Sequence, residues 1–314
     1  MTHATASYER IDYAVRPAKH VERKMIVDAL GRLRHFGALE EYRYVGFGST
    51  YFTDFTLFHR RLGIKHLVSI EADEHKKARF EFNKPLGFID LRFGLSTAVL
   101  PELNWTQRSI VWLDYDGMLD RTVLADLEYV CASATSGSVV MVTVNAHPNR
   151  REKDQLNALI ERVGEGAVPL GTTGADLAEW GLAAIGRRII DGRIRDFLRD
   201  RGVHPHRSAM NYRQLFNFRY QDSAMMNTVG GIVFDEGHRS HLGACGFGDF
   251  PFVSYDERFY LIQMPKLTLH EQRYLAGNLP IDLDAADLNG IPPEDVLRYS
   301  ALYRYFPTFV DADL

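Results

Sequence analysis

The sequence lacks the features that mark secreted, membrane-embedded and strongly nucleic-acid-binding chains. It holds two cysteines, Cys131 and Cys245, in 314 residues. Two are too few for a disulfide scaffold, so a reducing cytoplasm is the expected setting. No apolar run is long enough to span a bilayer, and the polar N-terminus does not resemble a signal peptide. A net charge of −4 and a pI near 6.3 give no overall attraction to nucleic acid or anionic membranes. We therefore expect a cytoplasmic globular protein.

The chain does contain a regular alternation of short apolar runs and helical patterns. Hydrophobic residues make up 46% of it, which is ample for a packed core. Strands are expected near residues 44–45, 66–70, 88–94, 109–113 and 138–144, with helical segments between them. This alternation predicts an α/β fold in which parallel strands are joined by right-handed helical crossovers.

The stretch 42–73 has the order strand, glycine turn, helix, strand, acidic residue. A short apolar segment leads into Gly46-Phe47-Gly48-Ser49, and phenylalanines at helical spacing follow. A second apolar run, residues 66–70, ends at Glu71. This order predicts a crossover unit that binds a nucleotide-type ligand at the glycine turn.

The residue types in this unit fit such a ligand. Gly46 and Gly48 let the backbone turn sharply and approach a ligand, because they carry no Cβ atom. The free N–H groups at the start of the next helix favour a polar or anionic group. Glu71 stands 23 residues after Gly48 (71 − 48), where a carboxylate accepts hydrogen bonds from a ribose diol. Tyr51 occupies the place of the third glycine of G-x-G-x-x-G, so a purely structural tight turn stays the alternative.

A second acidic group follows the strand expected at residues 109–113. The apolar residues of this strand run up to Asp114-Tyr115-Asp116-Gly117, a pattern typical of a buried strand whose end opens onto a crevice. Asp114 and Asp116 are two residues apart, so on an extended chain both side chains would point the same way. Two carboxylates so close together raise the pKa of one of them, which suits a general base. The alternative is that one of them caps the next helix.

Two groups of basic residues are also present. Arg16 and Lys19 stand at the start of a helix, and six arginines lie close together between positions 187 and 201. Either group could hold an anionic part of a substrate or cofactor. Solvated helix surfaces are the favoured interpretation of both.

The remaining segments define the predicted domains. Residues from about 148 to 210 are interpreted as a helical insertion or lid, because they are rich in arginine, glycine and helix formers. Alternating aromatics at 214–220 and an apolar run at 229–234 predict an antiparallel hairpin at the edge of the sheet. We predict one domain over residues 1–235 and a C-terminal extension, residues 236–314, packed on it.

The motifs GFGS, SIEAD, FGLS and WLDYDG together resemble the class I S-adenosylmethionine-dependent methyltransferase superfamily over about residues 17–235. They also resemble a group of bacterial proteins labelled O-methyltransferases. The resemblance implies a Rossmann-like doubly wound sheet, mostly parallel with an antiparallel C-terminal hairpin, and S-adenosylmethionine as cofactor. In that family the glycine turn passes the methionine part, the end of the second strand holds the ribose, and the third strand ends beside the adenine. The implied cofactor-binding residues are Gly46, Phe47, Gly48, Ser49, Glu71, Ala72, Ser96 and Asp114.

The resemblance also implies a reaction. A methyl group moves in line from a sulfonium to a nucleophile, and the enzyme holds the two in place. O-methyl transfer is favoured, with Asp114, Tyr115 and Asp116 as the predicted catalytic residues. One of the carboxylates serves as general base or stabilises charge, and Tyr115 lines the pocket. The adenine contact is expected at Ser96, because Leu95 stands where the family often has an aspartate.

Two metal-site patterns are incomplete, and no metal is predicted. Some related enzymes hold magnesium between the strand-four aspartate and an Asp-Asn pair, but Val144 stands before Asn145 here. The residues His238, His241, Cys245 and Asp249 have a spacing that superficially resembles a zinc site. A glycine-rich surface loop is the favoured interpretation of that segment.

Other functions stay open at this point. A nicotinamide-dependent oxidoreductase would use the same first crossover unit, although the missing third glycine counts against it. A Rossmann protein that binds a nucleotide or a nucleic acid without catalysis is the alternative of a different class. The Asp-Tyr-Asp-Gly sequence replaces the Asp/Asn-Pro-Pro-Tyr/Phe motif of adenine methylation in nucleic acids, so nucleic acid is not favoured. The expected partners are an unidentified methyl acceptor and, as a candidate, a second copy of the chain; no membrane is expected.

Overall fold

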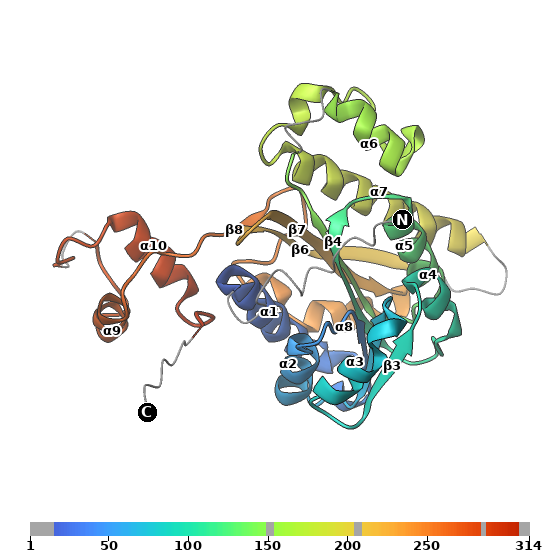
Figure 1. The fold of residues 1–314 in the computed structure, drawn as a ribbon, viewed down its shortest axis with the longest axis horizontal. Helices are drawn as coiled ribbons and strands as arrows, with labels where there is room; N and C mark the ends of the chain where they lie inside the picture. The colour runs from blue at the N-terminus through green and yellow to red at the C-terminus, as the bar shows by residue number, and fades with distance from the viewer. Residues whose placement is uncertain (1–15, 149–153, 204–208, 284–286, 308–314) are drawn as a thin grey trace.

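A single eight-stranded sheet with helices on both faces forms the centre of the protein (Figure 1). The computed structural model describes residues 16–148, 154–203, 209–283 and 287–307. The outer ends of the two predicted domains, residues 1–15 and 308–314, lie outside this described part. No helix within it is long and apolar enough to cross a membrane.

The strand order is that of a doubly wound sheet. The strands are β1 (Arg43–Gly46), β2 (His66–Glu71), β3 (Ile89–Phe93), β4 (Ser109–Met118), β5 (Val139–Asn145), β6 (Asn211–Gln221), β7 (Met225–Phe234) and β8 (Tyr260–Ile262). They lie in the order β3-β2-β1-β4-β5-β7-β6-β8. Strands β1 to β5 pair in parallel, β7 is antiparallel to β5 and β6, and β8 is parallel to β6. The predicted Rossmann-like sheet with its antiparallel hairpin is confirmed.

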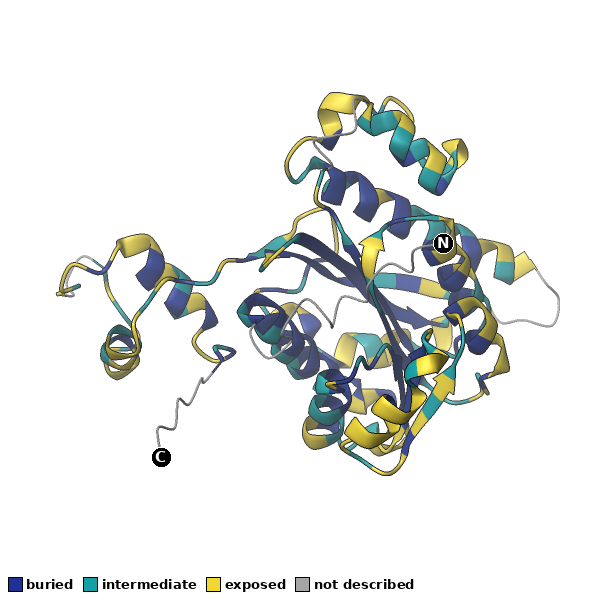
Figure 2. Cartoon of the chain, in the orientation of Figure 1, coloured by how far each residue is buried: buried dark blue, intermediate teal, exposed yellow. Residues whose placement is uncertain are grey.

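Helices cover the sheet on both faces. The helices of the described residues are α1 (Pro17–Leu30), α2 (Thr53–Leu62), α3 (Lys77–Asn83), α4 (Ser96–Val99), α5 (Arg121–Ser133), α6 (Gln155–Val163), α7 (Gly181–Val203), α8 (Arg239–Ala244), α9 (Leu269–Gly277) and α10 (Pro293–Leu302). Apolar residues of α1, α2 and α3 pack in one cluster, and those of α4, α5 and α7 pack in another. Trp112 belongs to the first cluster, and its neighbours Val111 and Leu113 to the second. The apolar part of β4, residues 109–113, is therefore buried on both faces (Figure 2), which explains its continuous apolar run.

The turn between β6 and β7 fixes the start of α1. The two carboxylate oxygens of Asp222 accept hydrogen bonds from the backbone N–H groups of Ala18 and Lys19, each at 3.1 Å. The first N–H groups of a helix have no partner inside the helix, so Asp222 satisfies two of them. Pro17 begins the helix and has no N–H to satisfy. A residue of the hairpin thus sets the position of α1.

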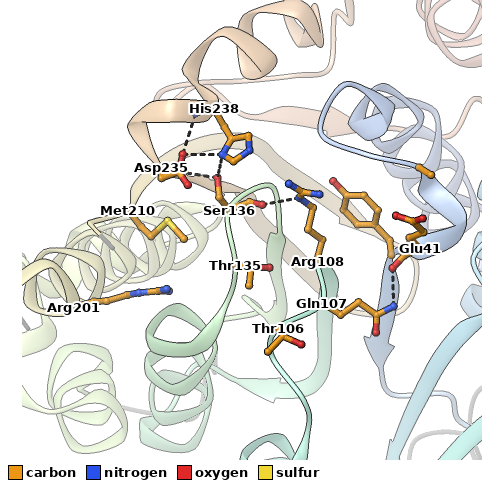
Figure 3. A pocket seen from close by; sticks show the side chains of 12 residues that line it. Glu41, Thr106, Gln107, Arg108, Thr135, Ser136, Arg201, Met210, Asp235 and His238 are labelled. Atoms are coloured by element: carbon orange, nitrogen blue, oxygen red, sulfur yellow. Dashed lines mark hydrogen bonds and ion pairs between the residues drawn. The ribbon is translucent and has the colours of Figure 1, made fainter. Parts of the chain in front are cut away.

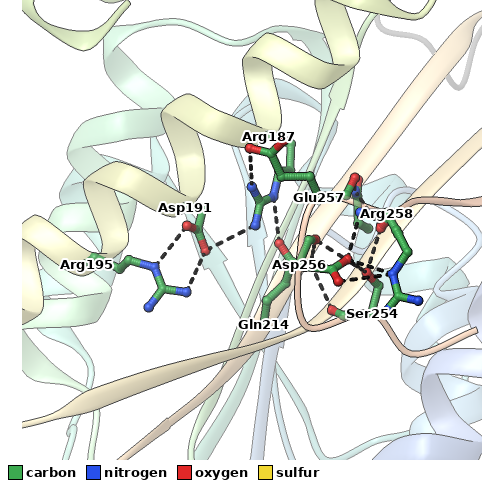
Figure 4. Close-up of polar contacts among 9 residues, drawn as sticks. Arg187, Asp191, Arg195, Gln214, Ser254, Asp256, Glu257 and Arg258 are labelled. Carbon is green, nitrogen blue, oxygen red and sulfur yellow. Dashed lines mark hydrogen bonds and ion pairs between the residues drawn. The ribbon is translucent and has the colours of Figure 1, made fainter. Parts of the chain in front are cut away.

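Two arginines of α7, Arg187 and Arg195, are engaged with the protein itself (Figure 4). Arg187 is buried and donates through Nε to Gln214 Oε1 of β6 at 2.8 Å. It also pairs with Asp191 at 3.7 Å and with Glu257 at 3.6 Å. Arg195 pairs with the same Asp191 at 2.9 Å. The interpretation of this arginine run as a solvated surface is wrong for Arg187, which helps to fasten α7 to the sheet.

Beyond β8 the chain forms a smaller unit around α9 and α10. Its apolar cluster contains the buried residues Leu275, Ile291, Val296 and Tyr299. Figure 1 shows this unit beside the sheet rather than on either face. The Tyr305 hydroxyl donates to Asp28 Oδ2 of α1 at 2.6 Å, so the end of the unit is tied to the first helix.

The segment from His238 to Cys245 is not the surface loop that the sequence predicts. A 3-10 turn (Glu236–His238) leads directly into α8. Cys245 is buried, and its thiol donates to the carbonyl oxygen of Arg32 at 3.3 Å. Cys245 thus contacts the 3-10 segment Gly31–His35 that follows α1.

Candidate functional site

A cavity of about 350 Å³ lies where β1, β2, β3 and β4 end. Its wall contains residues from all four strand ends: Phe47, Gly48 and Ser49; Glu71 and Ala72; Gly94, Leu95 and Ser96; Asp114, Tyr115 and Asp116. The predicted site residues thus line one cavity, with the exception of Gly46, which closes β1 just before the turn. Open α/β sheets bind their ligands in such a crevice at the carboxyl ends of the strands.

The turn after β1 leaves no room for larger residues. A Cβ atom on Gly48 would clash with the Ser69 hydroxyl and lie 2.7 Å from the Phe52 ring. A Cβ atom on Gly46 would lie 2.6 Å from the Tyr44 hydroxyl. Phe52 itself has a φ of 47°, in the left-handed region that costs free energy for a residue with a side chain. The sharp turn brings the Gly48 N–H to the base of the cavity.

Glu71 is held at this base by two hydrogen bonds. The Gly48 N–H donates to Glu71 Oε1 at 3.0 Å, and the Ser69 hydroxyl donates to the same oxygen at 2.6 Å. Glu71 is 6% exposed. Burial raises its pKa to about 7, against the lowering effect of the two hydrogen bonds. Its Oε2 has no hydrogen-bond partner among the described residues, so it can accept from hydroxyl groups of a ligand.

Ser96 and Tyr115 line the cavity and share one buried partner. The Ser96 hydroxyl donates to Asp126 Oδ2 at 2.5 Å, and the Tyr115 hydroxyl donates to the same oxygen. Asp126 lies on α5 and is 1% exposed; burial raises its pKa and that of Tyr115. The Tyr115 ring meets the Phe47 ring edge-on, with 5.1 Å between centroids. Tyr115 therefore forms a wall, and Asp126 is a site residue that the sequence reading missed.

Asp114 is paired with a buried lysine. Lys19 Nζ lies 2.9 Å from Asp114 Oδ2 and 2.9 Å from Glu22 Oε2. The side chains of Lys19 and Glu22 have no exposed surface, and the ammonium lies 4.4 Å from the centre of the Trp112 ring. Burial raises the pKa of Glu22. The expectation that Arg16 and Lys19 are solvated is wrong, because both are buried.

Asp114 and Asp116 both line the cavity, as expected for residues two apart on a strand. Strand β4 continues through both of them to Met118, which is further than its apolar run indicates. Asp116 is exposed. The next helix, α5, is capped by Asp120, which accepts a hydrogen bond from the Val123 N–H at 3.0 Å. The alternative that one of the paired aspartates is the helix cap is therefore wrong.

An ion pair between Arg23 and Asp54 completes the wall on the side of α1 and α2. Both residues are buried, and neither was predicted as a site residue. A signal was present in the sequence: Lys19, Glu22 and Arg23 follow one another at helical spacing. This signal was not sufficient, because charged residues on one face of a helix suggest a solvated surface when their partners elsewhere in the sequence are unknown.

The described residues contain no group of three or more His, Cys, Asp or Glu side chains arranged to hold a metal ion. Asn145 Oδ1 accepts a hydrogen bond from the His147 N–H at 2.8 Å. Asp114 Oδ2 is occupied by Lys19. The two residues that match the magnesium pattern thus have other partners.

A second cavity, of about 570 Å³, lies around the opposite ends of the strands (Figure 3). Its wall brings Ser136, His238 and Asp235 together. Ser136 Oγ lies 3.0 Å and Asp235 Oδ1 lies 2.8 Å from the same atom, His238 Nδ1. A Ser-His-Asp relay needs one partner on each ring nitrogen, so these contacts connect loops and do not activate the serine.

Comparison with known proteins identifies the family. A family described as "Putative O-methyltransferase" matches residues 11–314. The chain belongs to this family. The predicted resemblance to O-methyltransferases and the predicted enzyme class are thereby confirmed. Comparison with curated proteins gives no significant match.

Solved structures that match this chain include an O-methyltransferase and a protein named Trm1. An O-methyltransferase from Bacillus cereus in complex with SAH is 14% identical, with a TM-score of 0.38; the alignment covers 74% of this chain and 84% of that one. Trm1 from Pyrococcus horikoshii with S-adenosyl-L-methionine is 13% identical, with a TM-score of 0.43; the alignment covers 76% of this chain and 60% of that one.

Proposed function

We propose that this O-methyltransferase family member uses S-adenosylmethionine to methylate a hydroxyl group of a small acceptor. The observation that carries the cofactor assignment is the contact between the Gly48 N–H and the buried Glu71 carboxylate at the base of the cavity. It joins the tight glycine turn of β1 to an acidic residue at the end of β2. That combination suits an adenosine ligand, whose ribose diol offers two hydrogen-bond donors.

The residues present fit the cofactor. Gly48 and Glu71 line the same cavity, and Glu71 Oε2 has no hydrogen-bond partner among the described residues. Phe47 to Ser49 would hold the methionine part, Glu71 and Ala72 the ribose, and Ser96 the adenine. When bound, S-adenosylmethionine supplies a methyl group on a positively charged sulfur. The nicotinamide alternative has no comparable support, because family membership points to methyl transfer.

The protein groups that face the acceptor are Asp114 and Asp116. Lys19 holds Asp114 Oδ2, which leaves Oδ1 to accept a hydrogen bond from the acceptor hydroxyl and orient it. The exposed Asp116 would take the proton of the acceptor hydroxyl, whose oxygen would replace the cofactor sulfur on the methyl carbon. Tyr115 and Phe47 form an apolar wall that excludes water from this part of the cavity.

The charges in the wall favour a neutral or cationic acceptor. Among the described residues that line the cavity, Arg23 is the sole cation, and it is paired with Asp54. Asp116 adds negative charge to the wall, while the charge of Asp114 is balanced by Lys19. Two of the α7 arginines, Arg187 and Arg195, which could have bound a phosphate or nucleic acid, are paired with carboxylates of the protein. A phenol or alcohol acceptor that carries an amine, or that is uncharged, therefore fits better than one that carries a phosphate or a carboxylate.

Two free, buried cysteines agree with a cytoplasmic setting.

The test has a binding step and a transfer step. Isothermal titration with S-adenosylhomocysteine should give micromolar or tighter affinity, lost in Glu71→Ala. Methyl transfer from S-adenosylmethionine is then followed by mass spectrometry with phenols that differ in carrying an amine, no charge, a carboxylate or a phosphate. Asp116→Asn should slow transfer by about 100-fold or more while S-adenosylhomocysteine affinity stays within about threefold. A wild-type protein that binds no S-adenosylhomocysteine would refute the cofactor assignment.

A further inference from the structure

The hydrogen bonds of Asp126 determine which way two cavity hydroxyls donate. A serine or tyrosine hydroxyl has one proton to donate and lone pairs that accept. The protons of Ser96 and Tyr115 both go to Asp126 Oδ2. Ser96 Oγ can therefore offer the cavity only lone pairs.

The ionised form of Asp126 sets this polarity. The two donors converge on Oδ2, while Oδ1 is buried and has no hydrogen-bond partner among the described residues. An ionised carboxylate has no proton to donate, so Oδ2 accepts from both hydroxyls and Ser96 remains an acceptor toward the cavity.

Strand order places the adenine of the proposed cofactor beside Ser96. If Glu71 at the end of β2 binds the ribose and the Gly48 turn of β1 lies on one side of it, the base must lie on the other side. That side is β3, because the sheet order is β3-β2-β1-β4. Residues Gly94, Leu95 and Ser96 follow β3 and line this part of the cavity.

We infer that Asp126 is a positioning residue that makes the site select adenine: it takes the Ser96 proton, so that Ser96 Oγ accepts from the exocyclic amino group of the base. A base with a carbonyl oxygen at that place would set two acceptors against each other. The inference rests on the proposed function, because it requires an adenosine cofactor. It goes beyond that function in assigning base specificity to a residue of α5 that does not line the cavity.

The experiment compares S-adenosylhomocysteine with S-inosylhomocysteine, in which a carbonyl oxygen replaces the amino group. Isothermal titration of the wild-type protein should show S-adenosylhomocysteine binding at least about tenfold more tightly, the effect of one mismatched buried hydrogen bond. Ser96→Ala should bring the ratio of the two dissociation constants to within about threefold. Asp126→Leu should do the same, since Ser96 then rotates freely and can donate or accept.

Two further variants separate specificity from structure. Asp126→Asn should keep the wild-type preference, because its amide oxygen can accept from both hydroxyls. Asp120→Ala, which removes the cap of the same helix, should lower the melting temperature and leave the ratio unchanged. Tyr115→Phe should keep the preference for S-adenosylhomocysteine even where it weakens the binding of both ligands.

The outcomes are distinguishable. Binding of neither ligand by the wild-type protein refutes the proposed function itself. Equal binding of both ligands by the wild-type protein, or an unchanged ratio in Ser96→Ala, overturns the inference about Asp126 and leaves the cofactor assignment intact. If Asp126→Leu fails to fold by circular dichroism, the comparison of Ser96→Ala with Asp126→Asn decides.

Discussion

The Lys19 ammonium lies 2.9 Å from Asp114 Oδ2, and no part of the Lys19 side chain is exposed. A buried ammonium is costly unless charged and aromatic groups surround it. Here two carboxylates and the Trp112 ring do so. This contact joins α1 to the end of β4, and it holds one oxygen of a predicted catalytic carboxylate in place.

Replacement of Lys19 by methionine should therefore be strongly destabilising. Lys19→Met leaves the buried Glu22 and the partly buried Asp114 without their cation, and we expect a loss of about 3–5 kcal/mol in the free energy of unfolding. Urea denaturation measures this loss. The matched control is Lys84→Met, whose surface pair with Glu81 should contribute less than about 1 kcal/mol. The double variant Lys19→Met/Asp114→Asn should lose less than the sum of its single variants; additive losses would contradict the pairing.

The affinity for S-adenosylhomocysteine should depend on pH through Glu71. The ribose diol donates to the ionised carboxylate, and burial raises the Glu71 pKa to about 7. Affinity should therefore fall by up to about tenfold per unit as the pH falls below 7. Titration calorimetry between pH 5.5 and 8.5 measures this dependence. Glu71→Gln should bind weakly with a flat profile, and a wild-type profile equally flat would contradict the role of Glu71.

The stability of the ligand-free protein should show the opposite trend. A carboxyl whose pKa is raised in the folded state stabilises the fold below the unfolded value of 4.5, and this contribution is lost as the pH rises through about 7. The change is on the order of 3 kcal/mol. The difference in unfolding free energy between wild type and Glu71→Gln, followed from pH 4.5 to 8, isolates it from other titrating groups.

Substitution of Gly48 by alanine should damage both folding and ligand binding. Its Cβ would clash with Ser69 and Phe52, displacing the N–H that holds Glu71. We expect a loss of about 1–3 kcal/mol in unfolding free energy and at least about tenfold in S-adenosylhomocysteine affinity. In Gly192→Ala, within α7, the new Cβ meets no atom within 4 Å, so this control should gain up to about 1 kcal/mol. Normal S-adenosylhomocysteine affinity in Gly48→Ala would contradict the role of the Gly48 turn in holding Glu71.

The arginines of α7 should differ sharply in their contribution to stability. Arg187→Met breaks the buried contacts with Gln214 and Asp191, and we expect a loss of about 2–4 kcal/mol. Arg199→Met removes an exposed pair with Asp196, worth less than about 1 kcal/mol. Thermal or urea unfolding distinguishes the two. Similar stabilities for both variants would indicate that Arg187 does not fasten the helix.

The elements of the sheet could be predicted because each has a local signature. Strand β2 is an apolar run that stops at Glu71, and the phenylalanines of α2 recur at helical spacing. The acidic ends of β2 and β4 were recognisable for the same reason, since a charged residue directly after a buried strand lies at the edge of the sheet. The cavity residues at the strand ends follow from this regularity, whereas Arg23 and Asp54 of the helices do not.

The partners of these residues could not be predicted. Lys19 belongs to a helix with charges at regular spacing, and its burial depends on Asp114 and Asp222, which are distant in the sequence. Asp126 sits within the amphipathic pattern of α5, where its contact with Ser96 leaves no local signal. Sequence periodicity reports which face of an element is buried, but not which polar groups meet there.

The capping of α1 by Asp222 has a consequence for synthesis of the chain. A nascent chain that has left the ribosome through β5 already carries the glycine turn, Glu71 and both aspartates. The carboxylate that anchors Ala18 follows it by 204 positions. The N-terminal cap of α1 can therefore form only after the turn between β6 and β7 has been synthesised.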